Sequence, residues 1–456
     1  MTISRQIAEF VYSTDYETFP NQVVDKAKQC LLDSLGVALY GSRFEASKIS
    51  LKVIKQIGGS EESTILGTPY KAPCPLAAMA NGIRAHVADY DDSLVDFGHP
   101  SCVLMPATLA LAERENIDGR SLITSFILGS EVGSKLGRMM GWRHYETGWH
   151  VTGTVGTIGA ATAVAKLLNL SPPQIVNALG IAASSAGGLR QNFGTMTKSW
   201  HVGHAASAGV MAALLAQEGY SASALALDGE TGFIRAFQGD VNSTFLPEAL
   251  GNPYSLMKIM FKKYPSCHGT HAAVDAVLKL KEQYGFQSEE IEAIECYIRP
   301  LMKSVLIYKD PQTELEAKFS VEYCVAAALV LGRLGIAQFT DEVLFHPEVR
   351  SLMRKVSVRD DPTLEEIAKK GKLLAPSRVK VILSDGREYT QSVLEARGGP
   401  SEPLRWEELE KKFLECAGQV LLIDQAQKAL ALIRKIEEVD NMALLTEVLI
   451  PRPQKT

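Results

Sequence analysis

Apolar residues recur at helical spacing along the chain up to about residue 262. Four segments repeat apolar residues three and four positions apart, which is typical of amphipathic helices: 23–41, 76–90, 106–117 and 121–140. Gly41 and Gly141 are placed where such helices would stop. Three further segments are unusually apolar and rich in small residues, which let helix backbones approach closely: 152–170, 172–189 and 203–220. The pattern predicts one large all-helical domain over residues 1–262.

The hydrophobic pattern changes beyond that point. Four short runs are rich in β-branched and alternating apolar residues, as half-buried strands are: 291–300, 354–361, 377–386 and 387–396. Asp385-Gly386 separates the last two runs and predicts a tight hairpin turn. Helical patterns at 270–285 and 319–335 are interleaved with these strands. Residues 263–399 therefore predict a smaller α+β domain.

Helical spacing returns from Pro400 onward, in segments 406–421 and 425–449. We expect these C-terminal helices, within residues 400–456, to pack back on the first domain. The α+β domain would then be an insertion. The predicted fold class is mainly α, a large all-α domain with an inserted smaller α+β domain.

Composition and charge are those of a globular protein and narrow its partners. The 456 residues are 46% hydrophobic and 22% charged, and 47 Lys and Arg against 52 Asp and Glu give a net charge of −5. This balance does not favour binding to nucleic acid or to an anionic membrane. The chain has no run of the ~18 apolar residues that a membrane-spanning helix needs, and its start lacks a secretory signal pattern. We therefore expect a cytoplasmic protein.

Seven cysteines are scattered along the chain without a CxxC or CxxxC pair, at positions 30, 74, 102, 267, 296, 324 and 416. This spacing argues against a structural zinc site and against a compact iron–sulfur motif, so we expect neither a metal nor a cofactor. The simplest expectation is reduced, mostly buried thiols. Cys267 differs because it lies in a polar cluster.

The segment 85–105, AHVADYDDSLVDFGHPSCVLM, combines four Asp and two His before it turns apolar. Ionisable side chains rarely lie beside a buried helix unless they are paired or used. Asp89, Asp91 and Asp92 can supply bases or a hydrogen-bonded frame, and His99 can transfer a proton near neutral pH. The alternative is a solvated loop that caps the helix after it.

Other polar clusters add candidate residues. His150 directly precedes a small-residue helix, where free backbone N–H groups can hold an anion, although it could equally be a cap or a core residue. Lys198 has apolar sequence on both sides, which weakens a purely solvated explanation. Polar residues also gather at the junction of the two predicted domains, a favoured place for ligands, although a basic linker would look the same: Lys262, Lys263, Cys267, His268 and His271.

Several motifs follow one another along almost the whole chain: HxxDYDDS, HPS, GWHxTGTxGxxGAA, NFGTMTK, HxGxAA, KYPSCHGTH and FSVEYCVAAAL. In this order the chain resembles the MmgE/PrpD family, whose members include 2-methylcitrate dehydratase, cis-aconitate decarboxylase and iminodisuccinate epimerase. The resemblance implies a large all-α domain completed by the C-terminal helices, an inserted α+β lid domain and a homodimer. The fold it implies agrees with the fold predicted from periodicity.

The resemblance also implies an active-site cleft between the two domains. By motif, the residues that line this cleft in the decarboxylase branch correspond to Asp89, Ser93, His99, His150, Lys198, Lys262 and Tyr323. The junction histidine of that branch corresponds to Cys267, and His268 follows one place on, so either residue could occupy the proton-transfer position. This departure argues against decarboxylation of cis-aconitate, and the TMTK segment is similar to the epimerase branch.

The three activities share a chemistry that these residues suit. Each reaction needs a polycarboxylate held by cations and a negative charge stabilised next to a carboxylate. Lys198 and Lys262 would stabilise that charge. His99 and His150 would transfer protons, and Asp89 would orient an imidazole or fix its tautomer. Ser93 would bind substrate, and Cys267, His268 and Tyr323 complete the predicted catalytic set.

The sequence thus predicts a cofactor-free lyase that acts on a small di- or tricarboxylic acid, through an elimination of the 2-methylcitrate dehydratase type. The first alternative is an epimerase or racemase, which shares the initial proton abstraction. A cis-aconitate decarboxylase is the next alternative. A non-catalytic helical protein that binds a metabolite is the remote one.

Overall fold

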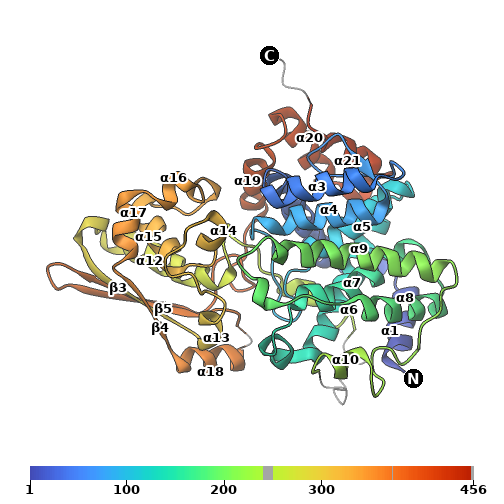
Figure 1. The fold of residues 1–456 in the computed structure, drawn as a ribbon, viewed down its shortest axis with the longest axis horizontal. Helices are drawn as coiled ribbons and strands as arrows, with labels where there is room; N and C mark the ends of the chain where they lie inside the picture. The colour runs from blue at the N-terminus through green and yellow to red at the C-terminus, as the bar shows by residue number, and fades with distance from the viewer. Residues whose placement is uncertain (240–249, 372, 453–456) are drawn as a thin grey trace.

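The computed structural model describes residues 1–239, 250–371 and 373–452, and it consists of two lobes (Figure 1). One lobe is built almost entirely of helices. The other contains the main sheet of the described residues together with shorter helices. Residues 240–249, 372 and 453–456, which belong to the predicted domain ranges, lie outside this description. The fold is mainly α, as the sequence predicted.

Most of the long helices in the helical lobe lie on segments predicted from periodicity. Its helices are α1 Ile3–Ser13, α2 Asn21–Gly41, α3 Glu45–Ile57, α4 Cys74–Val87, α5 Ser101–Arg114, α6 Gly119–Glu146, α7 Val151–Leu167, α8 Pro172–Ser185, α9 Thr197–Gln217 and α10 Phe233–Ala236. The sequence missed a small antiparallel pair of two-residue strands, β1 Ser63–Thr64 and β2 Lys71–Ala72. Strands this short carry too little pattern to be recognised in a sequence.

Small residues bring the central helices of this lobe into close contact, as predicted. Helix α7 packs between α6 and α9, and α4 packs on α9. A methyl group added at Gly209 of α9 would lie only 2.4 Å from the Cβ of Ala160 on α7. Glycine is required there because the two backbones approach too closely for a side chain.

Gly141 interrupts a helix, as its position predicted, but the helix resumes after it. Its φ of +61° lies in the left-handed region, and α6 bends there before it continues to Glu146. Glycine tolerates this conformation because it has no Cβ. The bend places Trp142 and Tyr145, on the last turn of α6, beside the seam between the lobes.

The second lobe contains a four-stranded mixed sheet in the order β4-β3-β5-β6. Its strands are β3 Ile291–Ile298, β4 Val356–Asp360, β5 Ser377–Leu383 and β6 Glu388–Val393. Strands β5 and β6 form the hairpin predicted at Asp385-Gly386, and Gly386 has a φ of +85°. The helices of this lobe are α12 His268–Tyr284, α13 Pro300–Lys303, α14 Glu314–Ala317, α15 Val321–Leu331, α16 Asp341–Leu344, α17 Pro347–Met353 and α18 Pro362–Gly371. Of these, α12 packs on β5 and β6, and α15 on β4.

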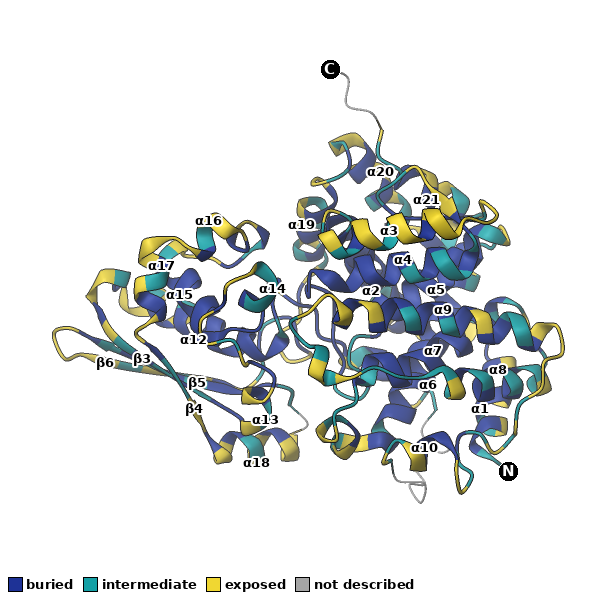
Figure 2. Cartoon of the chain, viewed as in Figure 1, coloured by how far each residue is buried: buried dark blue, intermediate teal, exposed yellow. Residues whose placement is uncertain are grey.

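Each lobe has its own main hydrophobic core (Figure 2). The first core extends from Ile3 to Phe261 and resumes from Leu404, whereas the second lies between Tyr264 and Ala396. The C-terminal helices are α19 Trp406–Ala417, α20 Ile423–Arg434 and α21 Ala443–Val448, and α19 packs against α2. These cores support the predicted division into 1–262, 263–399 and 400–456, which we retain as a proposal.

Among the described residues, no helix combines the length and the apolar character that crossing a bilayer requires.

Candidate active site

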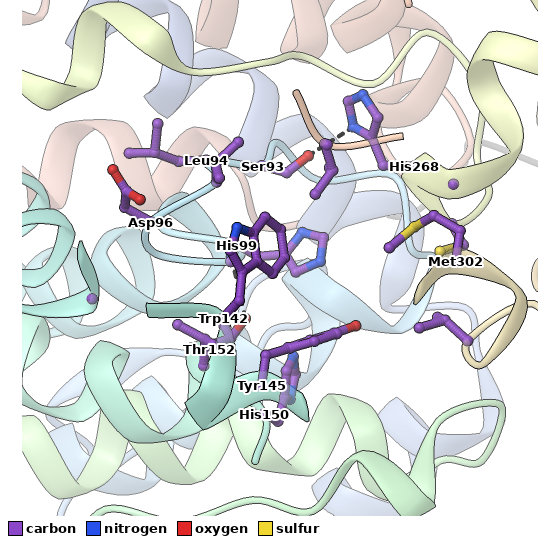
Figure 3. A pocket seen from close by; sticks show the side chains of 18 of the residues that line it. Ser93, Leu94, Asp96, His99, Trp142, Tyr145, His150, Thr152, His268 and Met302 are labelled. Atoms are coloured by element: carbon purple, nitrogen blue, oxygen red, sulfur yellow. Dashed lines mark hydrogen bonds between the residues drawn. The ribbon is translucent and has the colours of Figure 1, made fainter. Parts of the chain in front are cut away.

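A cavity of about 310 Å³ lies where the two lobes meet. Residues from the 89–99 segment, α6, α7 and α9 line it from the helical lobe, and residues from α12, α13 and α18 from the other (Figure 3). Eight of the nine residues proposed from sequence line it: Asp89, Ser93, His99, His150, Lys198, Lys262, Cys267 and His268. Segments more than 150 residues apart therefore converge on one cavity.

Asp89 holds two buried ammonium groups together at one side of the cavity. Its Oδ1 atom accepts hydrogen bonds from Lys198 Nζ at 2.9 Å and from Lys262 Nζ at 2.8 Å, and its carbonyl oxygen accepts a second bond from Lys262. The two lysines keep the pKa of Asp89 well below its usual range, although burial alone would raise it. Two cations thus share one carboxylate, so the cluster carries net positive charge.

The backbone of Asp89 has a φ of +50°, which is uncommon for a residue other than glycine. Asp and Asn adopt this left-handed conformation more readily than most residues. Backbone strain of this kind concentrates at functional sites. Here it occurs at the residue on which both lysines converge.

The His99 ring lines the cavity, and contacts to its Nδ1 atom hold the ring in place. Its Nδ1–H donates to the carbonyl oxygen of Asp92 at 2.7 Å and lies 3.3 Å from Oδ2 of Asp91. The same Oδ2 accepts a hydrogen bond from His86 Nδ1 at 2.8 Å. Burial lowers the pKa of His86 to about 4, and the two imidazoles keep the pKa of Asp91 well below its usual range.

The acidic segment is buried, so the solvated-loop alternative is wrong for most of it. Asp89, Asp91 and Asp92 are at most 3% exposed. Burial and the nearby Asp33 raise the pKa of Asp92 to about 8, and its carboxyl hydrogen-bonds the Ser101 hydroxyl at the start of α5. Asp92 is a structural neutral acid, whereas Asp89 and Asp91 are ionised.

His150 immediately precedes α7 and pairs with a second imidazole. Its Nδ1 lies 3.1 Å from Nδ1 of His201 on α9, so one of the two nitrogens must donate and the other accept. Burial lowers the pKa of His150 well below its ordinary value and that of His201 to about 4. Both rings are therefore neutral at neutral pH. His201 does not line the cavity itself but contacts His150, which does.

The junction residues Cys267 and His268 both line the cavity, from the cap and the first turn of α12. His268 Nδ1 lies 2.8 Å from the Ser93 hydroxyl, a hydrogen bond that crosses the seam (Figure 3). Burial lowers the pKa of His268 to about 3 and raises that of the Cys267 thiol. Both groups are uncharged at neutral pH.

Cationic side chains outnumber carboxylates in the lining of the cavity. Its lining has two carboxylates, Asp89 and Asp96, and four cationic side chains: Arg138, Lys198, Lys262 and Lys369. Arg138 and Asp96 form an ion pair at 2.8 Å. The buried lysine pair on Asp89 is the cationic end of the cavity, which suits an anionic ligand.

Two groups of described residues bring metal-ligating atoms close together: His86 with Asp91 and Cys102, and His86 with Asp89 and His99. In both groups the imidazole Nδ1 atoms already face the Asp91 carboxylate. The Asp89 carboxylate already forms ion pairs with Lys198 and Lys262. Two ammonium groups beside the carboxylate disfavour a metal cation, because like charges repel in a buried site.

Family comparison agrees with this organisation. The MmgE/PrpD N-terminal domain model matches residues 5–245, and the MmgE/PrpD C-terminal domain model matches residues 264–438. The chain belongs to the MmgE/PrpD family. The C-terminal family model runs past the second core into α19 and α20, which pack with the first core.

Three relatives show how the MmgE/PrpD chain compares across the family. It is 28% identical to cis-aconitate decarboxylase of Homo sapiens, over 98% of this chain and 94% of the relative. It is 27% identical to cis-aconitate decarboxylase of Aspergillus terreus, over 98% and 96%. It is 26% identical to 2-methylcitrate dehydratase of Salmonella typhimurium, over 86% and 85%. Decarboxylases and dehydratases are both lyases, and this MmgE/PrpD chain is an enzyme of that class.

Tyr323 is the one residue proposed from the MmgE/PrpD resemblance that does not line the cavity. It lies on the first turn of α15 with no exposed surface, its ring packs edge-to-face on Phe339, and its hydroxyl donates to the Gln338 carbonyl. Helix α15 is apolar all round and belongs to the core of the second lobe, so its tyrosine is buried there. We therefore do not carry Tyr323 into the site.

Sequence reasoning missed Tyr145, which lines the cavity from α6. Burial raises its pKa, so the phenol is neutral. Arg190 lies over its ring at 4.0 Å and donates to its carbonyl oxygen. Tyr145 belongs to the same HYETGWH segment that drew attention to His150, but the position of its ring depends on the bend at Gly141.

The predicted role of Asp89 also needs correction. Sequence reasoning assigned Asp89 to orient an imidazole, but its carboxylate contacts the two lysines. Asp91, two residues further on, contacts the imidazoles instead. The backbone at Asp89 is left-handed, and the spacing of residues in the sequence does not predict this conformation.

Proposed function

We propose that this protein is a lyase that removes water from a small di- or tricarboxylic acid, by an elimination of the 2-methylcitrate dehydratase type. The single observation that carries the proposal is the buried Lys198–Asp89–Lys262 cluster, which faces the cavity beside His99. Two cations on one carboxylate leave a positive site for a substrate carboxylate. A positioned imidazole next to it can take a proton from the neighbouring carbon.

The proposed reaction begins when His99 removes a proton from the carbon next to the bound carboxylate. The electron pair left on that carbon is delocalised into the carboxylate, where Lys198 and Lys262 stabilise the added charge. Preorganised donors of this kind are worth ~3–4 kcal/mol each. The pair then forms the carbon–carbon double bond as the hydroxyl leaves, and the hydroxyl departs as water with a proton from the site.

The neutral groups around the lysine cluster and His99 would bind and orient the substrate. His268 and Ser93 are hydrogen-bonded across the seam, so a substrate that contacts this pair would touch both lobes. His150 stands before α7 as a neutral imidazole, which can donate or accept one hydrogen bond. His150 is therefore suited to assist the leaving hydroxyl.

Decarboxylation of a tricarboxylic acid is the second candidate, because the cis-aconitate decarboxylases named above match more of the chain than the dehydratase does. Cys267 opposes it, since a neutral thiol stands where the decarboxylase branch has a histidine. An epimerisation would use the same proton abstraction and keep the hydroxyl or amine in place.

A panel of di- and tricarboxylic acids followed by proton NMR in deuterium oxide separates these reactions. New olefinic signals, with loss of the signals of the starting hydroxy acid, are the expected result and indicate elimination. Release of carbon dioxide indicates decarboxylation, and deuterium incorporation without net change indicates epimerisation. A protein that binds an acid of the panel and transforms none of them would contradict the proposed elimination.

A further inference from the structure

Asp91 lies behind the cavity at a position from which it can act only through another residue. Its carboxylate is fully buried, and it does not line the cavity. Its Oδ2 atom lies 2.8 Å from His86 Nδ1 and 3.3 Å from His99 Nδ1. His99 reaches the cavity with 16% of its side chain exposed, whereas His86 is fully enclosed.

The contacts of His99 decide which of its nitrogens faces the substrate. A backbone carbonyl can only accept a hydrogen bond, so the 2.7 Å contact to the Asp92 carbonyl places the proton on Nδ1. The Asp91 carboxylate, also an acceptor, faces the same nitrogen. The lone pair of the neutral ring is therefore on Nε2, on the side away from both acceptors.

We infer that Asp91 is the positioning residue of the reaction: it holds His99 in the tautomer that presents a free Nε2 and stabilises the imidazolium that forms when His99 takes a proton. This inference rests on the proposed function, in which His99 removes the proton. The logic is that of a carboxylate behind a catalytic imidazole. His86 weakens the stabilisation of the His99 imidazolium by Asp91, because the His86 Nδ1–H donates a hydrogen bond to the same carboxylate oxygen.

Other titratable groups face His99 from each neighbouring element: His86 on α4, Cys102 on α5, His150 before α7, His268 on α12, and Asp89 and Asp92 on its own segment. The charge of Asp89 is already shared with Lys198 and Lys262. The imidazoles, the thiol and the Asp92 carboxyl are neutral at pH 7. Asp91 is therefore the ionised group that acts most directly on the His99 ring.

Two substitutions test this inference by moving the acid limb of the kcat/KM profile in opposite directions. Asp91→Asn keeps the shape and an acceptor oxygen but removes the charge, so the imidazolium is less stable. The acid limb should move to lower pH by about one unit, a tenfold change in proton affinity, and kcat should fall about ten- to a hundredfold. His86→Phe leaves Asp91 to His99 alone, so the limb should move to higher pH.

Asp92→Asn is the matched control. Its carboxyl is neutral at pH 7 and its backbone carbonyl is unchanged by the substitution. The acid limb should stay in place in this variant, and Asp91→Glu, which restores the charge, should recover part of the rate. An Asp91→Asn enzyme with a lower rate but an unmoved acid limb would reduce Asp91 to a structural role and overturn the inference.

A second measurement does not depend on turnover. Nitrogen-15 NMR of the histidine-labelled protein at pH 8 reports which ring nitrogen carries the proton, and comparison with His99→Gln identifies the His99 signals. The Nδ1–H tautomer is expected, and the Nε2–H tautomer would overturn the inference even if no substrate were turned over. Failure of the proposed function would instead appear as a wild-type protein that transforms no acid of the panel.

Discussion

Lys198 combines deep burial with a partner that a second cation already satisfies. It is 7% exposed, and its ammonium group shares Oδ1 of Asp89 with Lys262. Substitution Lys198→Met should lower kcat/KM by ~10²–10³-fold, because one preorganised donor to the developing charge is lost. The melting temperature should change by only a few degrees, because Lys262 still neutralises Asp89. Steady-state kinetics and thermal unfolding of the same preparation measure both effects.

Asp89→Asn is the contrasting variant. It leaves two buried ammonium groups without their shared carboxylate, and breaking a buried pair in this way costs about 3–5 kcal/mol. If Lys198→Met unfolds as readily as Asp89→Asn, Lys198 stabilises the fold and does not serve the substrate.

By its motif, Cys267 is the proposed point of departure of this chain from the decarboxylase branch. The unmodified protein should release little or no carbon dioxide from cis-aconitate, because its neutral thiol is a poor substitute for a histidine as proton donor. Cys267→His should gain measurable release if the cavity accepts that acid. Headspace carbon dioxide with cis-aconitate measures both proteins. Rapid release by the unmodified protein would mean that His268, which lines the same cavity, acts in place of Cys267.

At the scale of elements, α19 ties the C-terminal helices to the active-site segment. Lys412 on α19 donates to the carbonyl oxygens of Tyr90 and Lys262, at 2.8 and 2.9 Å, and lies 2.6 Å from Asp33 on α2. Lys262 belongs to the lysine cluster, and Tyr90 directly follows Asp89 of that cluster. A C-terminal helix thus holds two parts of the site in register.

Lys412→Met should destabilise the protein by about 3–5 kcal/mol, because it leaves the buried Asp33 carboxylate without its cation. Adding Asp33→Asn to that variant should recover a large part of the loss, since neither charge then remains unpaired. Urea unfolding of the two single variants and the double variant gives the coupling. Additive losses would show that the pair contributes little and that packing of α19 dominates.

At the scale of the whole molecule, neutral buried imidazoles make stability depend on pH. The pKa of His86 and of His201 is about 4 and that of His268 about 3, below the ~6.5 of an unfolded histidine. The unfolded chain binds more protons between these values, so stability is complete above about pH 6.5 and is lost as pH falls toward 3. Each histidine contributes up to about 1.4 kcal/mol per pH unit in that window.

Urea unfolding at several pH values checks this dependence. The free energy of unfolding should fall between pH 6.5 and 4, and His268→Asn should show a shallower decline, because one of the neutral imidazoles is gone. A wild-type free energy of unfolding that stays constant over this range would contradict the assignment of neutral rings.

The implied homodimer remains a proposal, for which the helical lobe offers a surface. Helix α4 packs between α3 and α9 (Figure 1). Both outer helices expose apolar side chains, among them Ile49, Val53 and Ile57 on α3. On α9, Trp200 and Met211 are 46% and 43% exposed, three turns apart on one face. We expect a second copy to cover this face, because large exposed apolar side chains that share one face are typical of a protein interface.

Light scattering after gel filtration should give twice the protomer mass of 49.6 kDa, about 99 kDa. Trp200→Glu combined with Met211→Glu should shift the protein toward 49.6 kDa by placing charges on that face. A wild-type protein that elutes as a monomer at micromolar concentration would remove the dimer from the proposal.

Most of the long helices and the four strands of the main sheet followed from the sequence, because their causes are local. Apolar spacing of three and four residues predicted α2 and α4 through α9, and alternation with Asp385-Gly386 predicted the β5–β6 hairpin. Clusters of costly polar residues marked most of the site for the same reason, since buried charge needs a use or a partner. The family motifs then joined these clusters into one proposed cavity.

Tertiary structure alone decided which of these residues meet and in which pairs. Asp89, which has a left-handed backbone, contacts the lysines, whereas Asp91 contacts the imidazoles. Tyr323 is buried in the second core. Tyr145 lines the cavity because α6 bends at Gly141. Which side chains contact each other depends on distances between segments far apart in the chain, on burial that shifts proton affinity and on backbone conformation. The local spacing of residues in the sequence predicts none of these.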